Sequence, residues 1–270
     1  MKKALVILAM GFLPATAGAD LVISTLNSTA TVNFDSTVLG VNNGAFAGTG
    51  FHSEPIEGQL DSDGWAVTGF SDGDLAFSGI GITGDYARGT SNVGVSDGGI
   101  YAFLVATNDL ALGIQPSDED WTPGTLTLRI FNDTSSTINQ LDIAYEIWVR
   151  NDQASANSFN FSYSPDGSSF TAVSALDLTS IEGAETAAIW RQNNRATSIS
   201  GLSFAHGAQF YLRWSGDFVS GSGSRDEFAL DDISVTAAIP EPETYALLLA
   251  GLALLGFAAR RRKLKGAAAA

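Results

Sequence analysis

Alternation of apolar and polar residues is the dominant pattern in the middle of the chain. It is longest at 141–149, where Leu, Ile, Tyr, Ile and Val alternate with Asp, Ala, Glu and Trp. The same period of two recurs at 126–131, 159–163 and 210–214, and Trp214 falls in phase with the apolar set. This period is typical of strands that bury one face. These segments therefore predict antiparallel strands, with Trp214 in the core.

Clusters of turn-forming residues separate these segments, at 132–136, 164–167 and 220–224. Between residues 20 and 238 no segment of helical length carries an apolar stripe with a period of 3.6 residues. Many short strands with turns between them are typical of sandwiches. The pattern predicts an all-β fold, an antiparallel β-sandwich of jelly-roll type.

The alternation slips once, near the end of this region. Phe228 and Leu230 are in phase, Ile233 and Val235 are in phase, and the two pairs are out of phase with each other. Because a change of phase turns side chains to the other face of a sheet, the slip indicates either a β-bulge or a strand that begins at Ile233.

Residues 1–19 have the features of a signal peptide. Two lysines follow Met1, an apolar stretch runs over 4–13, and Ala17 and Ala19 form a small-residue cleavage site before Asp20. We expect the mature chain to begin at Asp20 and to be exported. Small exported domains usually need disulfides, but a body of about 220 residues can bury a sufficient core without them. The absence of cysteine is therefore compatible with export.

The C-terminal segment 239–265 predicts a single transmembrane helix. Residues 245–259 carry no charge and span about 22 Å as a helix. A basic cluster follows at Arg260, Arg261 and Arg262, which should keep this end in the cytoplasm and the 20–238 body outside the inner membrane. Residues 266–270 form a short tail.

Pro240, Glu241 and Pro242 precede this predicted helix. With Thr244, the Leu/Ala/Gly helix and the arginines, the segment resembles the PEP-CTERM sorting signal of exported proteins in exopolysaccharide-producing Gram-negative bacteria. The resemblance implies that an exosortase, a transpeptidase-like membrane enzyme, cleaves near Pro240, Glu241 and Pro242. The Lys-Leu-Lys-Gly-Ala-Ala-Ala-Ala ending departs from the family, whose tails stop soon after the arginines.

Residues 125–236 also resemble the C-terminal part of a β-sandwich module of bacterial exported proteins. The similarity lies in segments such as 145–150, 161–164, 212–214 and 229–235. It implies the fold and names no ligand.

Charge narrows the choice of partners. Residues 20–239 hold seven arginines, no lysine and 27 acidic residues, a net charge of −20. A field of that sign repels phosphate backbones, which excludes nucleic acid as a partner.

The chain offers few groups for nucleophilic catalysis. Only His52 and His206 are present, there is no Cys, and no G-x-S-x-G motif occurs. We therefore predict a protein without enzymatic activity. A secreted hydrolase acting on matrix polysaccharide through paired carboxylates is the alternative.

Carboxylates in loops are suitable ligands for Ca²⁺, which is the one cofactor that the sequence favours. The first candidate is Asp231 and Asp232 at the phase slip, with Glu227; the second combines 61–64 with 72–74. If either site bound calcium, the protein would be a Ca²⁺-stabilised adhesin. The alternative is that these acids hold turns through local hydrogen bonds.

Trp148 predicts a carbohydrate surface. It shares a strand face with Asp142, Glu146 and Arg150, and an aromatic plane flanked by hydrogen-bonding groups suits a sugar. The alternative is a Trp half covered by a loop, with Glu146 and Arg150 as cross-strand neighbours. Together, these features predict an exported cell-surface or biofilm-matrix protein, processed by an exosortase, that binds exopolysaccharide.

Overall fold

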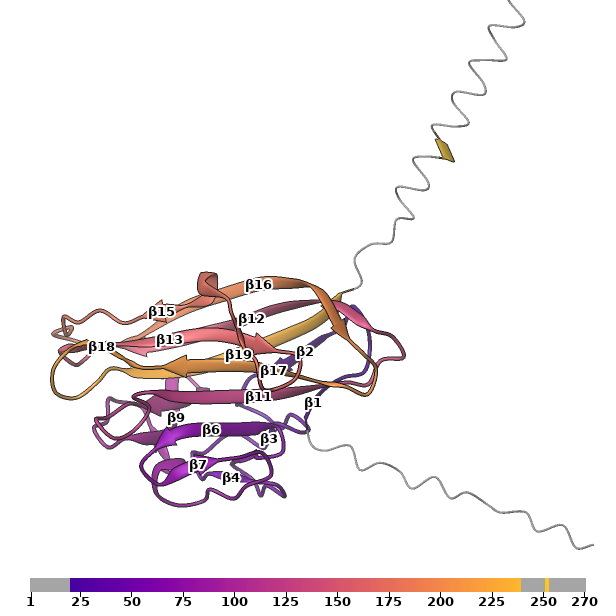
Figure 1. Ribbon diagram of the computed structural model, residues 1–270. Coiled ribbons are helices and arrows are strands. Elements are labelled where there is room, and N and C mark those ends of the chain that lie inside the picture. Colours follow the sequence, from indigo (N-terminus) through magenta and orange to yellow (C-terminus); the bar gives the residue numbers. More distant parts are fainter. Residues whose placement is uncertain (1–19, 239–250, 253–270) are drawn as a thin grey trace, which may run out of the picture.

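Two β-sheets pack face to face in the computed structural model, which describes residues 20–238 and 251–252 (Figure 1). The predicted antiparallel β-sandwich is confirmed. The first sheet, sheet A, contains in spatial order β14 (Thr171–Ala172), β13 (Ser155–Ser164), β17 (Gln209–Gly216), β11 (Gly124–Asn132), β6 (Trp65–Phe70) and β7 (Gly73–Leu75). Three short strands extend it, namely β1 (Leu21–Ile23) on β11, and β15 (Leu178–Thr179) and β18 (Phe218–Gly221) on β13.

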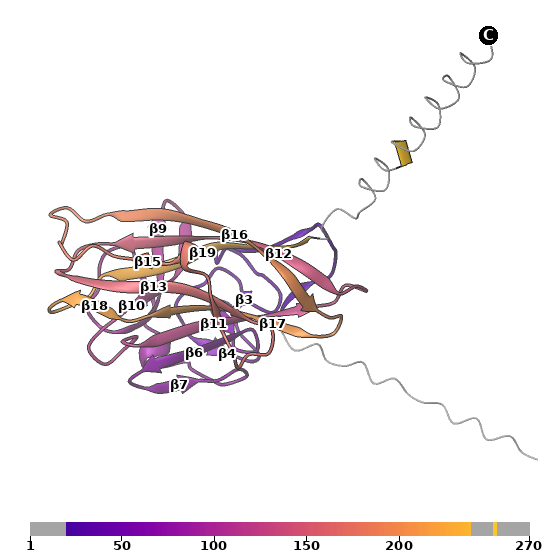
Figure 2. The same cartoon turned by 45° about the horizontal axis from the view of Figure 1, so that its top comes forward.

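The second sheet, sheet B, is the one that matters for the site. Its spatial order is β16 (Trp190–Phe204), β12 (Ile138–Arg150), β19 (Glu227–Ala238), β10 (Asp109–Gln115), β9 (Gly99–Ala106) and β8 (Thr90–Ser91), with β2 (Thr29–Val32) beside β19. The strands β16, β12 and β19 lie side by side in both views (Figures 1 and 2).

The remaining elements are short. They are β3 (Asn42–Asn43), β4 (Phe51–His52) and β5 (Gln59–Asp61), which form a small sheet, and the 3-10 helices η1 (Gly84–Tyr86) and η2 (Ser174–Leu176). Not all pairs are antiparallel, since β1–β11, β4–β5 and β8–β9 run parallel. From β11 onward the long strands β11, β12, β13, β16, β17 and β19 alternate between the two sheets, a connection pattern typical of a jelly roll.

The core lies between the sheets and is rich in aromatic side chains. The apolar residues that alternate along β12 are buried there, as predicted from their period of two. Trp214 is fully buried, with its ring 5.4 Å from that of Tyr145 on the opposite sheet and 6.4 Å from that of Trp65. Such aromatic contacts join the sheets and give the sandwich much of its buried apolar area.

The phase slip in β19 is a β-bulge within one continuous strand. Asp231 pairs with Glu146 and Ser234 pairs with Ala144, so three steps on β19 match two steps on β12. Asp232 is the extra residue, and its φ of 45° is left-handed. The first of the two predicted alternatives is therefore correct: the bulge keeps Ile233 and Val235 in the core although their phase differs from that of Phe228.

Both ends of the described body meet at β19. Asn27 N donates to Ala237 O at 2.8 Å, and β2 pairs with residues 233–236. The predicted signal peptide, the Pro-Glu-Pro motif and the basic cluster lie outside the described residues, as does the predicted transmembrane helix except for Gly251 and Leu252. Across residues 20–238 and 251–252, no helix has the length and apolarity needed to span a bilayer.

Candidate functional site

The face of sheet B that points away from the core carries polar and small side chains in ordered rows. Register across β2, β19, β12 and β16 aligns two such rows. The first contains Thr29, Thr236, Asp142 and Ser198, and the second contains Thr31, Ser234, Ala144 and Ala196. The next row along β12 contains Asp231, Glu146 and Asn194. Four strands from distant parts of the chain thus build one polar surface.

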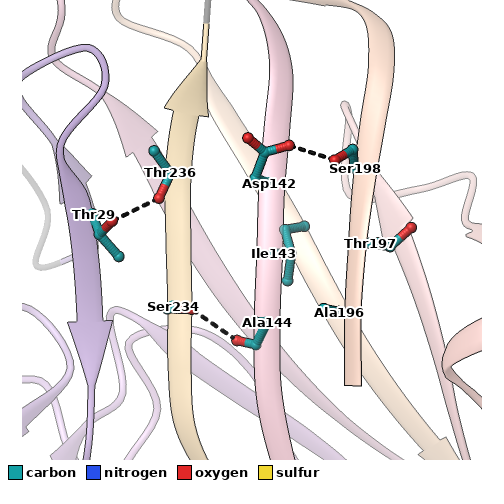
Figure 3. Close-up of a pocket in the computed structure, with 9 residues that line it drawn as sticks. All are labelled: Thr29, Asp142, Ile143, Ala144, Ala196, Thr197, Ser198, Ser234 and Thr236. Atoms are coloured by element: carbon teal, nitrogen blue, oxygen red, sulfur yellow. Dashed lines mark hydrogen bonds between the residues drawn. The ribbon is translucent and has the colours of Figure 1, made fainter. Parts of the chain in front are cut away.

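A hollow of about 410 Å³ opens on the first two rows (Figure 3). Its lining comprises Thr29, Asp142, Ile143, Ala144, Ala196, Thr197, Ser198, Ser234 and Thr236. An adjoining hollow of about 240 Å³ shares Ala144 and Ala196 with it and adds Tyr145, Glu146, Asn194, Arg195 and Asp232. We call the two together the sheet-B trough.

Short side chains explain why this surface is hollowed. Ala144, Ala196 and Ser234 lie next to one another in register on three neighbouring strands. Longer residues stand on either side, with Asp142 two positions away along β12 in one direction and Glu146 in the other. Since side chains on one face of a sheet stand side by side, a row of methyl and hydroxymethyl groups leaves a depression.

Hydrogen bonds fix several polar groups of the trough in place (Figure 3). Asp142 Oδ1 accepts from Ser198 Oγ at 2.6 Å and from Gln140 Nε2 at 2.8 Å. The hydroxyls of Thr29 and Thr236 lie 2.8 Å apart, and Ser234 Oγ donates to the carbonyl of Ala144 at 3.3 Å. No hydrogen bond reaches Asp142 Oδ2 from the described residues, so this oxygen remains available to a ligand.

Glu146 lies between the trough and an aromatic cluster. Its Oε2 accepts from the indole Nε1 of Trp148 at 3.2 Å. Burial, together with the negative charges of Asp232 and Asp109, raises the pKa of Glu146 above its usual range, against hydrogen bonds from Gln192 and Trp148. The predicted neighbours on β12 are thus in direct contact.

Trp148 is half-buried against this cluster. Trp148 and Trp190 both pack against a group that includes Tyr101 and Phe103, and the rings of Phe103 and Trp190 lie 4.8 Å apart. The cluster lies over Ala229 and beside Gly113, where a Cβ would lie 2.0 Å from the Phe103 ring. Small residues in the middle of the sheet therefore leave room for large rings to pack against its outer face.

Arg150 lies on the same face but belongs to the far end of β12. Its Nε contacts Asp152 Oδ2 at 3.2 Å, and it stands in register with Trp190 and Glu227. Eight residues separate it from Asp142, about 26 Å at ~3.3 Å per residue. The four residues predicted as a carbohydrate surface thus share one face, and two of them, Asp142 and Glu146, line the trough.

In the first predicted calcium site, Glu227 lies apart from Asp231 and Asp232 on β19. Glu227 stands opposite Arg150 and Asp231 stands opposite Glu146, so the two acids are four residues, about 13 Å, apart on one strand. Within residues 20–238 and 251–252, no three His, Asp or Glu side chains are grouped to hold a metal ion. Residues 227–231 form a regular extended strand, and this keeps Glu227 away from the bulge at Asp231 and Asp232.

Acids of the second predicted metal cluster accept hydrogen bonds from backbone amides. Asp61 Oδ1 accepts from Asp63 N at 3.0 Å, Asp72 Oδ2 accepts from Asp85 N at 2.9 Å, and Asp74 Oδ1 accepts from Gly69 N at 2.9 Å. The bonds of Asp61 and Asp74 are the local, turn-holding bonds of the alternative interpretation, whereas Asp72 and Asp85 are 13 residues apart. Of the two histidines, His206 lies in an exposed turn and His52 Nδ1 accepts from Glu54 N at 2.9 Å.

Sequence reasoning missed the hydroxyl-bearing part of the trough. Thr29, Ser198, Ser234 and Thr236 each lie in segments with alternating polar positions. Alternation gave each residue's face, but only the pairing of β2, β19, β12 and β16 shows that they meet.

Comparison with known families matches residues 238–263 to the PEP-CTERM protein-sorting motif. No curated protein matches the chain. Among solved structures, similarity extends to the K1 cleaved adhesin domain of Lys-gingipain from Porphyromonas gingivalis, at 14% identity and a TM-score of 0.40, covering 78% of this chain and 99% of that one. A non-crystalline cellulose specific carbohydrate-binding module, CBM28, is 14% identical with a TM-score of 0.36, covering 73% and 97%.

At such low identities and TM-scores, the likeness is confined to the type of fold. The match to the sorting motif is of a different kind, because it falls on the Pro-Glu-Pro sequence, the apolar segment and the arginines that carried the resemblance. The chain therefore joins a β-sandwich body to a PEP-CTERM protein-sorting motif, the mark of an exosortase-sorted exported protein.

Proposed function

We propose that this protein is a non-enzymatic component of the cell surface or extracellular matrix that binds exopolysaccharide in the sheet-B trough. The observation that carries the proposal is the trough itself, an open hollow on the outer face of sheet B that holds both polar and apolar groups. Hydroxyls, an amide and carboxylates line it, and Trp148 stands beside it. Such groups exchange hydrogen bonds with sugar hydroxyls, and an indole packs against the apolar face of a sugar ring.

The trough suits an extended ligand better than a small molecule. The two hollows adjoin along β12 and β16 and are open to solvent, so a chain of several sugars could lie across them. Preformed hydrogen bonds around Asp142 and Thr236 hold the lining side chains in place before a ligand arrives, which lowers the entropic cost of binding.

Sorting is the second part of the proposal. A signal peptide exports the chain, residues 239–265 hold it in the inner membrane, and an exosortase then cuts near Pro240, Glu241 and Pro242. The body then reaches the surface or the medium. Support comes from the motif match and from the position of Pro240, two residues beyond the end of β19, where a cut leaves the sandwich whole.

Binding is tested with exopolysaccharide from the native host, by affinity electrophoresis of the exported protein. We expect retardation, and we expect Trp148→Ala to weaken it by about two- to tenfold, since an aromatic contact is worth about 0.5–1.5 kcal/mol beyond the area that it buries. Tyr211→Ala, which removes an aromatic side chain from the outer face of sheet A, is the matched control. Equal loss in both variants, or no retardation of the parent protein, contradicts the proposal.

Processing is tested by intact-mass analysis of the protein from its native host. A mature form that starts at Asp20 and ends near Pro240–Pro242, absent when the exosortase is deleted, supports it. A full-length product in the inner membrane of an exosortase-competent host contradicts it.

A further inference from the structure

The sheet-B trough is strongly acidic. Asp142, Glu146 and Asp232 line it, and Asp109 and Asp35 stand close enough to act on these carboxylates. Burial and then the charges of Asp109 and Asp35 raise the pKa of Asp232. The acids on this side of β19 and β12 therefore repel one another.

One basic side chain lines the trough, and it is engaged elsewhere. Arg195 donates from Nε to Leu176 O at 3.3 Å, from Nη1 to Asn194 O at 3.0 Å and from Nη2 to Asp177 O at 3.4 Å. Its guanidinium is turned to backbone carbonyls rather than to the carboxylates. Within the described part of the chain, Asp142, Glu146 and Asp232 form no ion pair with a basic side chain.

A positively charged ligand would supply the missing counter-charge. An ammonium group bound to a carboxylate forms a charge-assisted hydrogen bond, stronger than the bond from a neutral hydroxyl. A uronic acid or sulfated sugar would instead bring a like charge to the acids, which costs free energy and slows the encounter. Neutral sugars with hydroxyl or acetamido groups should bind the trough with an affinity between those of the amino sugars and the acidic sugars.

We propose that the trough recognises a polysaccharide of amino sugars with free amino groups, and that Asp142 and Glu146 bind those amines. This inference rests on the proposed glycan-binding function and names its ligand class. Asp142 offers its unbonded Oδ2, and Glu146 lies four residues along β12, about 13 Å away. That separation exceeds one sugar ring, so the two carboxylates read different units of the chain.

The test compares three oligosaccharides by isothermal titration calorimetry at pH 6. They are a β-1,4-linked glucosamine hexamer, its fully N-acetylated form and a uronic acid hexamer. The exported protein is used with its C-terminal segment intact, in a polyoxyethylene detergent that carries no sugar. We expect the glucosamine hexamer to bind about tenfold or more tighter than the acetylated one, the worth of one good ion pair. The uronic acid hexamer should bind more weakly than both.

Two variants separate the trough from the net charge of the protein. Asp142→Asn combined with Glu146→Gln should abolish the preference for the glucosamine hexamer over the acetylated hexamer. Glu57→Gln removes an exposed acid next to β5 and should leave the preference unchanged.

Three results would contradict the inference. Equal affinity for the acetylated and free-amine hexamers overturns the inference and leaves the glycan-binding function standing. The same holds if the preference persists in the Asp142→Asn, Glu146→Gln double variant, because it then comes from the overall charge. Absence of binding to all three hexamers and to the host polysaccharide overturns the proposed function as well.

Discussion

Two acids on β19, Glu227 and Asp231, are almost completely buried, and they give the protein a pH-dependent stability. Burial, then the charge of Asp152, raises the pKa of Glu227 to about 8. Burial, then the charges of Asp232 and Asp109, raises the pKa of Asp231 to about 9. An acid whose pKa is higher when folded holds its proton more tightly when folded. Below about pH 4 both acids are protonated in the folded and the unfolded chain, so their ionisation does not change the free energy of unfolding. As pH rises from about 4 towards 8 and 9, their ionisation in the unfolded chain lowers the free energy of unfolding.

Asp231→Asn should flatten this dependence. The amide cannot ionise, and its oxygen can still accept the 2.7 Å hydrogen bond from Asp232 N. We expect the free energy of unfolding at pH 8.5 to rise by about 1–3 kcal/mol, the usual cost of a poorly compensated buried polar group, and to rise by less at pH 5. Urea unfolding at both pH values measures it. Asp133→Asn, at an exposed acid, should leave the profile unchanged, and a less stable Asp231→Asn at pH 8.5 contradicts the prediction.

Asp20, the expected first residue of the mature chain, depends on Arg129. It is 1% exposed, with Oδ1 2.5 Å from Arg129 Nε and Oδ2 3.0 Å from Gln209 Nε2. Arg129→Met leaves a buried carboxylate without its counter-charge and should cost about 3–5 kcal/mol. Adding Asp20→Asn removes that charge and should restore part of the loss. A double-mutant cycle from urea unfolding measures the coupling, and strictly additive effects would contradict it.

At the scale of elements, the period of two correctly predicted the strand faces. The buried faces of β11, β12 and β17 follow directly from alternation, because a half-buried strand needs an apolar residue at every second position. Strands of two residues such as β3 and β8 are too short to show a period. The trough escaped prediction for another reason: Thr29 and Ser198 meet through pairing with β19 and β12, and alternation carries no information about partners.

The bulge at Asp232 gives an exacting test of register. Deleting Asp232 leaves two steps from Asp231 to Ser234, matching the two steps from Glu146 to Ala144. The strand becomes regular, a residue with a φ of 45° is removed, and every buried side chain keeps its face. We expect cooperative melting with stability within about 1 kcal/mol of the parent.

Deleting Ser234 is the matched control. It leaves the bulge in place and turns Val235 and Ala237, both fully buried, towards solvent while Thr236 turns inward. This variant should lose cooperative melting, followed by near-UV circular dichroism and calorimetry. If the two deletions proved equally damaging, the register assigned to β19 would be wrong.

On the scale of the whole molecule, β19 links the body to the sorting motif. It is a central strand of sheet B, bonded to β12 along one edge and to β10 and β2 along the other, and it ends at Ala238. The motif begins at the same residue. A processing enzyme that cut inside the strand would remove core residues, whereas a cut at Pro240 or beyond leaves β19 complete.

This arrangement predicts where truncation becomes harmful. A chain ending at Ala238 should melt cooperatively, because β19 and its bond from Asn27 are retained. A chain ending at Asp232 loses Ile233 and Val235, both 0% exposed. At about 1.5–3 kcal/mol for each buried side chain, the loss reaches about 3–6 kcal/mol. That is comparable with the total stability of many domains, about 5–15 kcal/mol.

Calorimetry of the two truncated chains, expressed from Asp20, measures the difference. The Ala238 form should retain at least the melting temperature of the full chain, and the Asp232 form should show no cooperative transition near it. Stable folding of the Asp232 form would mean that sheet B forms without the pairing of residues 233–238 to β2 and β12. A cut within β19 would then be tolerated, whereas loss of folding in the Asp232 form agrees with the proposed processing from Ile239 onward.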